Sequence, residues 1–475
     1  MFKNIPATII LIFTLVFFSG FANLATEIIG PRLIASLFGS TTIIWAIIIS
    51  VTLVGISFGY FLGGRIRPAS VTKVLPAILV LNAVWLLAIS WFIWAIRGQI
   101  GSVGYLKLGS VSFAAFFPPA VLFSMTSPLA ISLLSTAYPK EAFSKLVGNI
   151  YAVGALGSVL GALAAAFLFI PWVGLSVSLK IFALIEVIFA IIFLSPRLRL
   201  FSPILILFIF LIPFPNYRLE GDFSSILLEQ REGYYQTIRI YTDNISYIRM
   251  DLGPTLQTKM SLGEKEPLYP YAQEMVVLAG DVQGKSILII GGAGHTQARA
   301  LEKRGALVTE IEIDLFVIRM SDQYFGEIAG PVLAVDGRAY LEGLRDVDFN
   351  LILVDAFDGL GTIPTQLTTQ EFFQAANRAL TPDGRLIYNF IGIAEGLGSN
   401  SFRALCATLA SVFADTRASE VAGEELMNLI LIASQAEMAD IVYPPAPKDG
   451  FVLTDDLNPV EIFFVQALGD YYSFR

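Results

Sequence analysis

Hydrophobic residues form long uninterrupted runs in the first part of the chain and alternate with polar residues in the rest. A membrane-spanning helix needs about 20 predominantly apolar residues. Seven runs reach or approach that length: 6–26, 42–63, 74–96, 111–134, 147–170, 176–195 and the shorter 199–214. The pattern therefore predicts a transmembrane helical domain of six or seven spans over residues 1–215, followed by a water-soluble half.

The first run also fits a cleaved signal peptide. Lys3 precedes its apolar residues, and the small residues Ala22 and Ala25 lie near its end, as they do around a signal-peptide cleavage site. We expect a retained helix instead.

Small residues recur at helical spacing in the fifth run, which reads GNIYAVGALGSVLGALAAAF. Gly148, Gly154, Gly157 and Gly161 would let a second helix approach closely, as small residues do between membrane helices. Glycine is also generally tolerated in such helices, but this spacing favours a packing face.

Two acidic residues, Glu27 and Glu186, lie in or beside predicted spans. Ionisable residues at that depth are functional candidates by default. Glu27 fits equally well a helix end near lipid headgroups, and Glu186 could pair with a neighbour such as Lys180.

The distribution of Lys and Arg around the spans leaves the orientation open, although cytoplasmic loops are usually enriched in both. With seven spans, the water-soluble half lies outside the cytoplasm. If 199–214 lies in the membrane interface instead, six spans return it to the cytoplasm. With seven spans, one side holds Lys3, Arg65, Arg67, Lys73, Lys140, Lys145, Arg197 and Arg199, and the other holds Arg32, Arg97, Lys107, Lys180 and Arg218.

The second half begins with a pattern typical of antiparallel strands. Residues 231–260 read REGYYQTIRIYTDNISYIRMDLGPTLQTKM, in which a TDN turn separates two alternating runs. This predicts a β-hairpin, and we assign residues 216–275 to a β-hairpin region.

A strand, a glycine turn, a helix and a second strand follow it. KSILII (285–290) is a short buried strand, GGAGHTQARALEKRG opens a helix, and ALVTEIEID is the next strand. This order is typical of a nucleoside-binding α/β unit. We therefore predict a Rossmann-like α/β domain over residues 276–475.

Glycines and an acidic strand end predict where a nucleoside would bind. Gly291, Gly292 and Gly294 let the backbone approach a ligand closely, and the helix that follows offers free N–H groups. Glu312 ends the second strand about 20 residues later, where a carboxylate could hold ribose hydroxyls.

Carboxylates also end the next two strands. Asp336 follows VLAV, and Asp355 and Asp358 follow LILV. The carboxyl ends of parallel strands share one edge of a sheet, so these side chains should project into the same crevice. Paired carboxylates can hold a cationic amine and accept the proton it loses. Asp358 fits a turn cap equally well.

Three further polar residues are placed near the crevice by the hairpin. Tyr235, Gln236 and Gln257 could line it, although aromatic residues in strands more often serve packing. His295, directly after the glycines, is expected to belong to the turn or helix start rather than to catalysis.

The composition limits the partners and the types of catalytic site that this chain can have. The chain is 55% hydrophobic and 15% charged, whereas a soluble protein carries about 25% charged residues. The net charge of -8 argues against a nucleic-acid partner. With one cysteine, Cys406, and one histidine, His295, a disulfide framework, a cysteine zinc site, a Ser-His-Asp triad and a multi-histidine metal site are excluded. Catalysis must rest on carboxylates, tyrosines, amides or backbone, and we expect no metal.

These motifs together resemble the spermidine synthases, or polyamine aminopropyltransferases, and specifically their membrane-fused branch. The water-soluble half is similar through YYQTIRI, ILIIGGAG, EIEID, VDGRAYL, VDAFDGLGTIPTQLTTQEFF and VLTDDLNPVE, and the helical half through FFSGFANLATEIIGPRLIASLFGSTT and GNIYAVGALGSVLGA.

The resemblance implies a Rossmann-like domain of the S-adenosylmethionine-dependent transferase type, preceded by a β-hairpin region. It also implies an enzyme of polyamine biosynthesis that binds decarboxylated S-adenosylmethionine, whose aminopropyl group is attacked by an amine such as putrescine. By position, Asp355 matches the family's general base and Asp358 its amine-binding aspartate. Glu312 matches the ribose ligand, and Asp336 with Gly337 the contact on the adenine side.

Gln236 and Gln257 match family positions that border the substrate groove. One position departs from the family pattern. Soluble members have an aspartate in the glycine turn, GGGDGG, that holds the aminopropyl amine, whereas here the turn reads GGAGHT with Gly294 at that place. The cationic donor therefore loses one anchor.

We accordingly expect a multi-pass protein of the bacterial inner membrane that acts as a spermidine synthase-like aminopropyltransferase. Its expected partners are the lipid bilayer and a small-molecule amine, and a homo-oligomer or a membrane-complex partner is compatible with the sequence. The changed glycine turn leaves two alternatives. One is a methyltransferase that uses ordinary S-adenosylmethionine, and the other is a non-catalytic membrane subunit or scaffold that retains the fold.

Overall fold

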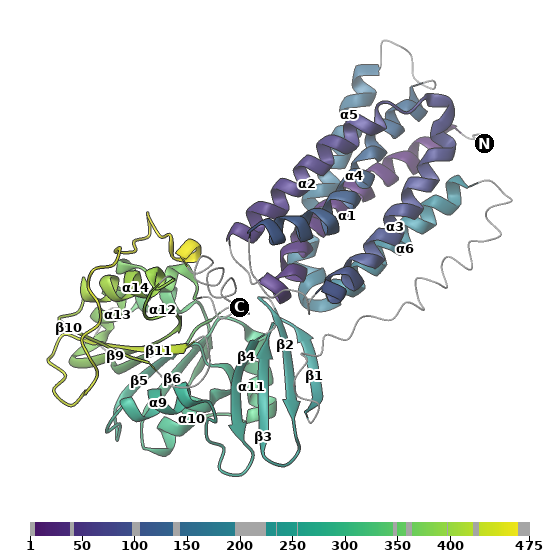
Figure 1. Cartoon of the computed structure of the whole chain (residues 1–475). Coiled ribbons are helices and arrows are strands. Elements are labelled where there is room, and N and C mark those ends of the chain that lie inside the picture. The colour runs from purple at the N-terminus through teal and green to yellow at the C-terminus, as the bar shows by residue number, and fades with distance from the viewer. Residues whose placement is uncertain are drawn as a thin grey trace. The chain divides into compact units, whose positions relative to one another are not determined.

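The computed structural model describes most of the chain as two compact units, one before residue 195 and one after residue 224 (Figure 1). The predicted short span 199–214, the boundary at 215 and Asp358 lie outside the described residues, so the three-part division stays a prediction. The described residues are 5–38, 42–96, 105–135, 143–194, 225–233, 235–253, 255–344, 349–357, 363–396, 398–420 and 427–463.

The first unit is a bundle of helices. Its described residues form six long helices that are apolar and long enough to cross a membrane, which confirms six of the seven predicted runs as helices. A 3-10 turn, η1 (Pro68–Ser70), precedes the third helix, and a π-helical segment, η4 (Ala165–Val173), follows the fifth. The helices are α1 (Ile5–Phe38), α2 (Thr42–Gly63), α3 (Val71–Ile96), α4 (Tyr105–Leu134), α5 (Phe143–Ala164) and α6 (Leu175–Phe193).

Glycines bring α5 against α1, as the sequence predicts. A Cβ added to Gly157 or Gly161 would lie 2.1 Å from a carbonyl oxygen of α1, so only glycine permits this approach. The prediction is wrong for Gly148, since within the described residues no heavy atom outside its own stretch of helix lies within 4 Å of its added Cβ. A second close approach, between α2 and α4, was not predicted and rests on Gly55, Gly59 and Gly63.

Glu27 and Glu186, the acidic residues in the described part of the bundle, differ from their sequence-based interpretations. Glu27 lies inside α1, which continues to Phe38, and is 8% exposed, so it does not mark a helix end. Glu186 accepts a hydrogen bond from Asn82 of α3 and not from Lys180. Glu186 is six residues after Lys180, which places their side chains about 120° apart around the helix axis.

The second unit starts with a four-stranded antiparallel sheet in the order β1-β2-β3-β4. The sequence predicts a hairpin here, and the predicted TDN turn connects β2 to β3. The face of this sheet packs on helix α11 (Leu315–Phe325) through Phe316, Met320 and their neighbours. The strands are β1 (Ile226–Glu232), β2 (Thr237–Thr242), β3 (Tyr247–Leu252) and β4 (Thr255–Ser261).

A seven-stranded sheet follows in the order β10-β11-β9-β8-β5-β6-β7. Strands β9, β8, β5, β6 and β7 are parallel, while β11 and β10 form an antiparallel edge. The elements are α9 (Pro270–Leu278), β5 (Ser286–Ile290), α10 (Thr296–Lys303), β6 (Leu307–Glu312), β7 (Val332–Ala334), α12 (Gly337–Gly343), β8 (Phe349–Val354), α13 (Gln370–Ala379), β9 (Leu380–Gly392), α14 (Asn400–Ala410), β10 (Asp415–Glu420) and β11 (Met427–Ser434).

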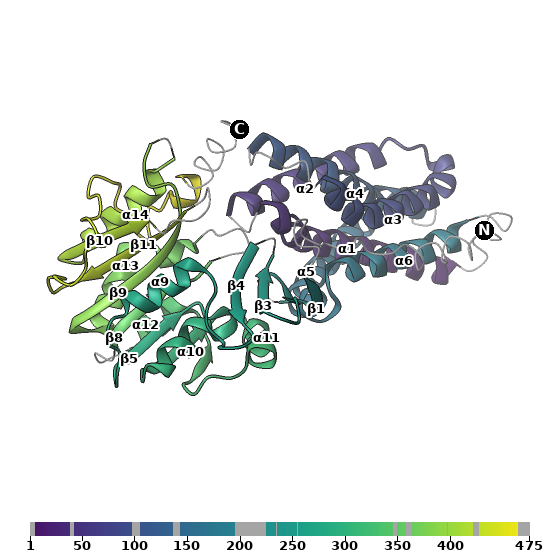
Figure 2. The same ribbon diagram turned by 60° about the horizontal axis from the view of Figure 1, so that its bottom comes forward.

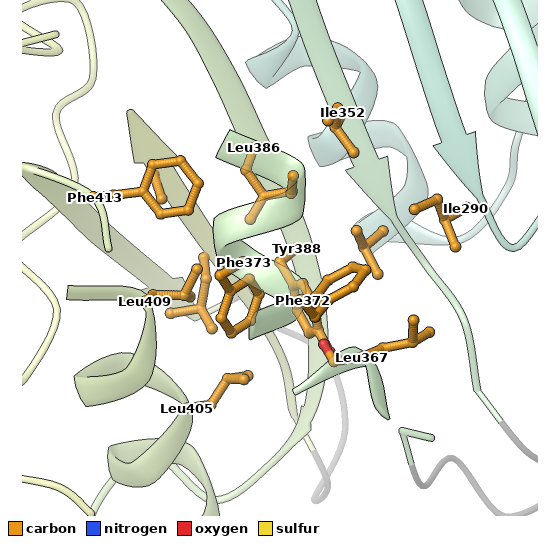
Figure 3. Packing of buried hydrophobic residues seen from close by; sticks show 14 of the residues in the cluster. Ile290, Ile352, Leu367, Phe372, Phe373, Leu386, Tyr388, Leu405, Leu409 and Phe413 are labelled. Atoms are coloured by element: carbon orange, nitrogen blue, oxygen red, sulfur yellow. The ribbon is translucent and has the colours of Figure 1, made fainter. Parts of the chain in front are cut away.

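Both faces of this sheet are buried, which explains why its strands read as continuous apolar runs. Helices α12, α13 and α14 cover one face and α9 and α10 the other (Figures 1 and 2). Successive residues of β5 alternate between them, with Leu288 in the first cluster and Ile289 in the second. Phe372 and Phe373 fill the centre of the first cluster (Figure 3).

The chain reverses its direction across the sheet between two neighbouring strands. From β5 it proceeds to β6 and β7 on one side, then crosses to β8 and β9 on the other. In an open α/β sheet the ligand site lies at the carboxyl ends of the strands at such a reversal. The residues that follow β5 and β8 are therefore the expected place of a ligand site.

Candidate active site

The glycine turn after β5 lies directly against the end of β8. Gly291 has φ of 93°, and an added Cβ would lie 2.3 Å from the carbonyl oxygen of Asp355. The Asp355 amide in turn donates to the carbonyl of Ile290 at 2.9 Å. Both a left-handed backbone and the lack of a side chain are needed here, so Gly291 joins the two strand ends at the reversal point.

Asp355 is held by two side-chain amides. Nε2 of Gln297, in the first turn of α10, donates to Oδ2 at 2.7 Å, and Nδ2 of Asn389, on β9, donates to Oδ1 at 2.9 Å. Burial raises the pKa of Asp355 above its ordinary value, and the two amides act against this rise. The result is a fixed carboxylate that is more basic than one in water.

A tyrosine connects Asp355 to the antiparallel sheet. The hydroxyl of Tyr271, at the start of α9, donates to the carbonyl of Gln257 on β4 at 3.0 Å. Burial, followed by the nearby charge of Asp355, raises the pKa of Tyr271, so this hydroxyl stays neutral. The backbone of Gln257 is thereby tied to Tyr271, while its side chain donates to Thr255 at 2.8 Å, so a role for Gln257 at the substrate groove stays a prediction.

Glu312 ends β6, next to β5 on the side opposite β8. Its Oε1 accepts the amide of Asp314 at 3.0 Å. Burial raises the pKa of Glu312 to about 7, although hydrogen bonds from the backbone N–H groups of Asp314 and Gly292 lower this pKa in part. Glu312 is therefore a half-buried carboxyl group that titrates near neutral pH.

Asp314 draws the start of β2 toward Glu312. Oδ2 of Asp314 accepts the Tyr235 amide at 3.3 Å, and Oδ1 caps α11 by accepting the Phe316 amide at 2.9 Å. Tyr235 itself is exposed. Gln236, the next residue, has a buried Oε1 without a hydrogen-bond partner among the described residues.

Asp336 follows β7 and stands at the same edge of the sheet. Its Oδ1 accepts the Ala339 amide at 2.9 Å, so it caps α12. Gly337 begins that helix, and a Cβ added to it would lie 2.4 Å from Ile290. The close packing of α12 against β5 therefore requires glycine at this position.

The only histidine belongs to the glycine turn, as the sequence predicts. His295 has φ of 53°, is buried, and bonds through Nδ1 to Glu310 and through Nε2 to Asp322 at 3.2 Å. Burial by itself lowers the pKa of His295, but the carboxylates of Glu310 and Asp322 outweigh burial and raise the pKa above its ordinary value. The imidazole faces these acids and not Asp355.

The sequence interpretation missed four residues of this region. Gln297 and Tyr271 carry no motif of their own. Asn389 and Glu310 each interrupt an apolar strand, in LIYNF and TEIE. A polar residue at a buried strand position could have indicated a site residue. The predicted residues Glu312, Asp336 and Asp355 do end strands at one edge of the sheet, in the order β8, β5, β6, β7. No group of three or more potential metal ligands occurs within the described ranges.

Comparison with known proteins adds a domain assignment to this geometry. Residues 270–421 match the spermine/spermidine synthase domain. This range extends from α9 to just past β10 and contains Gln297, Asp355 and Asn389. The resemblance inferred from the motifs is thus confirmed for the C-terminal part of the chain.

Three similar proteins illustrate the match. A probable polyamine aminopropyl transferase of Bifidobacterium longum is 38% identical over 131 residues, 27% of this chain and 29% of that protein. An N-terminal histidine N-methyltransferase of Emericella nidulans is 28% identical over 177 residues, 35% of this chain and 31% of that protein. A crystal structure of a probable spermidine synthase from Corynebacterium glutamicum, 21% identical, covers 44% of this chain and 81% of its own, with a TM-score of 0.40. The chain thus spans less than a third of the length of either sequence relative.

Proposed function

We propose that this protein is a membrane-bound, spermidine synthase-like aminopropyltransferase that transfers an aminopropyl group from decarboxylated S-adenosylmethionine to an amine such as putrescine. One observation carries the proposal: at the reversal point of the sheet, both oxygens of Asp355 accept hydrogen bonds from the amides of Gln297 and Asn389. The match of residues 270–421 to the spermine/spermidine synthase domain supports the same reaction class.

Asp355 is the proposed general base. An amine attacks carbon only after it loses a proton, and a carboxylate with a raised pKa accepts that proton more readily. The nitrogen forms a bond to the aminopropyl carbon, and the bond from that carbon to the sulfonium sulfur breaks. Its electron pair goes to sulfur, giving neutral methylthioadenosine, while the proton from the amine goes to Asp355.

Two buried acceptors favour an amine as the second substrate. Oδ1 of Asn389 and Oε1 of Gln236 have no hydrogen-bond partner within the described part of the chain. Buried acceptors of this kind normally require a donor. An alkylammonium ion offers three N–H donors and no acceptor, so its binding would satisfy the Asn389 oxygen beside the base.

The donor nucleoside is proposed to lie over the ends of β5, β6 and β7. Glu312 would accept hydrogen bonds from the ribose hydroxyls, and Asp336 with Gly337 would flank the adenine. The backbone of Gly291 and Gly292 leaves room for the donor to approach the start of α10. When bound, the donor supplies an aminopropyl group on a sulfonium centre.

Gly294 stands where soluble family members have the aspartate that holds the aminopropyl amine of the donor. Its φ is 74°, and a Cβ added there would lie 2.5 Å from the methyl group of Thr258. An aspartate at residue 294 would therefore require the Thr258 side chain or β4 to shift. The remaining residues of the site fit the donor through Glu312 and the glycine turn, so donor recognition is proposed to rest on those groups.

Product identification tests the proposal. The purified full chain, incubated with decarboxylated S-adenosylmethionine and putrescine, is expected to release methylthioadenosine and spermidine in equal amounts, as measured by liquid chromatography with mass spectrometry. Absence of both products, together with absence of methylthioadenosine binding, would overturn the proposal.

A methyltransferase is the second candidate. It is favoured by Gly294 and by the 28% identity to a histidine N-methyltransferase. Calorimetric titration with the two donors separates the candidates. Tighter binding of ordinary S-adenosylmethionine than of its decarboxylated form supports methyl transfer, whereas equal or tighter binding of the decarboxylated form supports aminopropyl transfer.

The membrane location is part of the proposal and rests on the six apolar helices of the first unit. Because donor and diamine are made in the cytoplasm, the α/β unit is proposed to face that side. A side-specific reporter fused to the C-terminus should then report the cytoplasm. A reporter signal from the opposite side would contradict the cytoplasmic orientation and support the scaffold interpretation.

A further inference from the structure

A second polar centre lies inside the helical unit, between α3 and α6. Nδ2 of Asn82 donates a hydrogen bond to Oε1 of Glu186 at 3.0 Å. The two residues are 0% and 1% exposed. A carboxyl group so completely removed from solvent needs partners for both of its oxygens.

The remaining oxygens of this pair are Oε2 of Glu186 and Oδ1 of Asn82. Neither has a hydrogen-bond partner among the described residues. If Glu186 is ionised, both are acceptors without a donor. A proton on Oε2 changes this, because the acid then donates to Oδ1 of Asn82 while Oε1 accepts from Nδ2. One proton therefore satisfies both buried oxygens and removes the buried charge.

The pair lies near the middle of two candidate membrane spans. These spans are Pro68–Ile93 and Leu175–Phe193, which place Asn82 and Glu186 far from either end. A charged side chain at such a depth is costly and marks a functional site by default. A second polar contact, Ser90 to Ser176 at 3.2 Å, joins the same two helices about two to three turns away.

Other charged groups do not balance Glu186. Lys180 lies six residues away on α6, about 9 Å along the axis, and Lys73 lies nine residues from Asn82, about 14 Å along α3. Glu186 bonds to neither within the described residues. The charged side chains on the described parts of α3, α6 and the helices packed against them are Lys73, Lys180, Glu27, Arg32 and Lys107.

We propose that Glu186 and Asn82 form a proton-binding site at mid-depth of the helical unit, in which Glu186 holds a proton and exchanges it with the surroundings. Loss of this proton leaves an unbalanced negative charge between α3 and α6. Proton release is thereby linked to separation of these two helices, which gives the helical unit a chemistry of its own besides anchoring the α/β unit.

Labelling with dicyclohexylcarbodiimide tests this site in the full chain, reconstituted in phosphatidylcholine vesicles. A protonated carboxyl group adds across a C=N bond of the reagent: the proton goes to nitrogen and the carboxyl oxygen bonds to carbon. The acyl group then moves to nitrogen, so the labelled peptide gains the whole mass of the reagent. The label is expected on Glu186 at neutral pH, with a yield that falls as the pH rises.

Three variants sharpen the test. Glu186→Gln should abolish the label in its peptide, while Ser90→Ala, on the same helix pair, should leave the labelling of Glu186 unchanged. Asn82→Leu removes the partner that holds the acid proton, and labelling of Glu186 should become several-fold faster. An unchanged labelling rate in Asn82→Leu would contradict the proposed pair.

Two further outcomes would overturn the proposal. Label on Glu27 without label on Glu186 would show that the reagent enters the helices but meets an ionised Glu186, whose oxygens are then held by water or a metal ion. Protection of Glu186 by sodium or spermidine at constant pH would assign the site to that cation instead of a proton. Neither measurement depends on transferase activity, so the result is independent of the proposed function.

Discussion

His295 bonds through Nδ1 to the buried carboxylate of Glu310, fifteen residues further along the chain. The pair lies next to the glycine turn, because a Cβ added to Gly292 would lie 2.1 Å from the Glu310 carboxyl group. Nε2 of His295 meets Asp322 of α11 at 3.2 Å. His295, the only histidine of the sequence, thus fixes the glycine turn, in which Gly291 packs against Asp355.

Replacement of this histidine is expected to destabilise the α/β unit in a pH-dependent way. His295→Gln removes the cationic partner of the buried Glu310 carboxylate, and loss of one partner of a buried ion pair costs about 3–5 kcal/mol. Because the pKa of His295 is raised in the folded protein, its contribution is fully present below the unfolded-state pKa of about 6.5 and is lost as pH rises through the folded-state pKa.

Urea denaturation of the detergent-solubilised chain, followed by circular dichroism at pH values below and above the folded-state pKa of His295, measures this contribution to the free energy of unfolding. The difference between wild type and His295→Gln should shrink toward high pH. Asp322→Asn is the matched control, since Asp322 is 38% exposed and should cost much less. A difference that does not change with pH would contradict the charged pair.

Gln297 is expected to set the pKa of the base. In Gln297→Leu, Asp355 loses one of the N–H bonds that oppose the effect of burial, so its pKa should rise further. The acidic limb of the kcat/KM profile should then move to higher pH, with a rate loss of about tenfold or more at neutral pH. An unshifted limb would contradict this positioning role, and Gln283→Leu, far from Asp355 at the other end of β5, is the control.

Glu312 is expected to make nucleoside binding depend on pH. Its pKa is raised to about 7, and the ionised form is the better acceptor for ribose hydroxyls. Calorimetric affinity for methylthioadenosine should therefore increase as pH rises through about 7, and Glu312→Gln should show weaker, pH-independent binding. Equal affinity on both sides of that pH in the wild type would contradict the ribose role.

The α1–α5 contact provides a matched pair of glycine substitutions. Gly157→Leu places a side chain where its Cβ meets the Phe17 carbonyl at 2.1 Å, whereas Gly148→Leu enters open space. Overpacking of this kind costs about 1–3 kcal/mol. Thermal unfolding in detergent should show a clear drop in Tm for Gly157→Leu and little change for Gly148→Leu. Equal effects of the two substitutions would contradict the packing.

The sequence predicts well those features that depend on residues close together in the chain. The six long apolar helices of the described residues follow from the lengths of apolar runs, and the strand ends at Glu312 and Asp355 follow from acids placed directly after buried strands. Since parallel strands share an edge, these residues could be assigned to one side of the sheet without the structure. Helix α1 continues to Phe38, past the end of the predicted run 6–26, and includes Pro31.

The remaining contacts join residues far apart in the chain. Gln297 meets Asp355 across 58 residues, and Asn82 meets Glu186 across 104. Such pairs depend on the order of strands in the sheet and on which helices are neighbours. Hydrophobic periodicity gives no information about either. For this reason the amides around Asp355 were missed, and Lys180 was considered as the partner of Glu186.

Release of methylthioadenosine by Asp355→Asn is the most direct test of the proposed chemistry. With decarboxylated S-adenosylmethionine and putrescine, the wild-type chain should release it, and Asp355→Asn should do so about 10²- to 10⁴-fold more slowly while still binding methylthioadenosine. Asp383→Asn, at an exposed position of β9, should match the wild type. Asp355→Asn with activity close to the wild-type rate would contradict the assignment of Asp355 as the base.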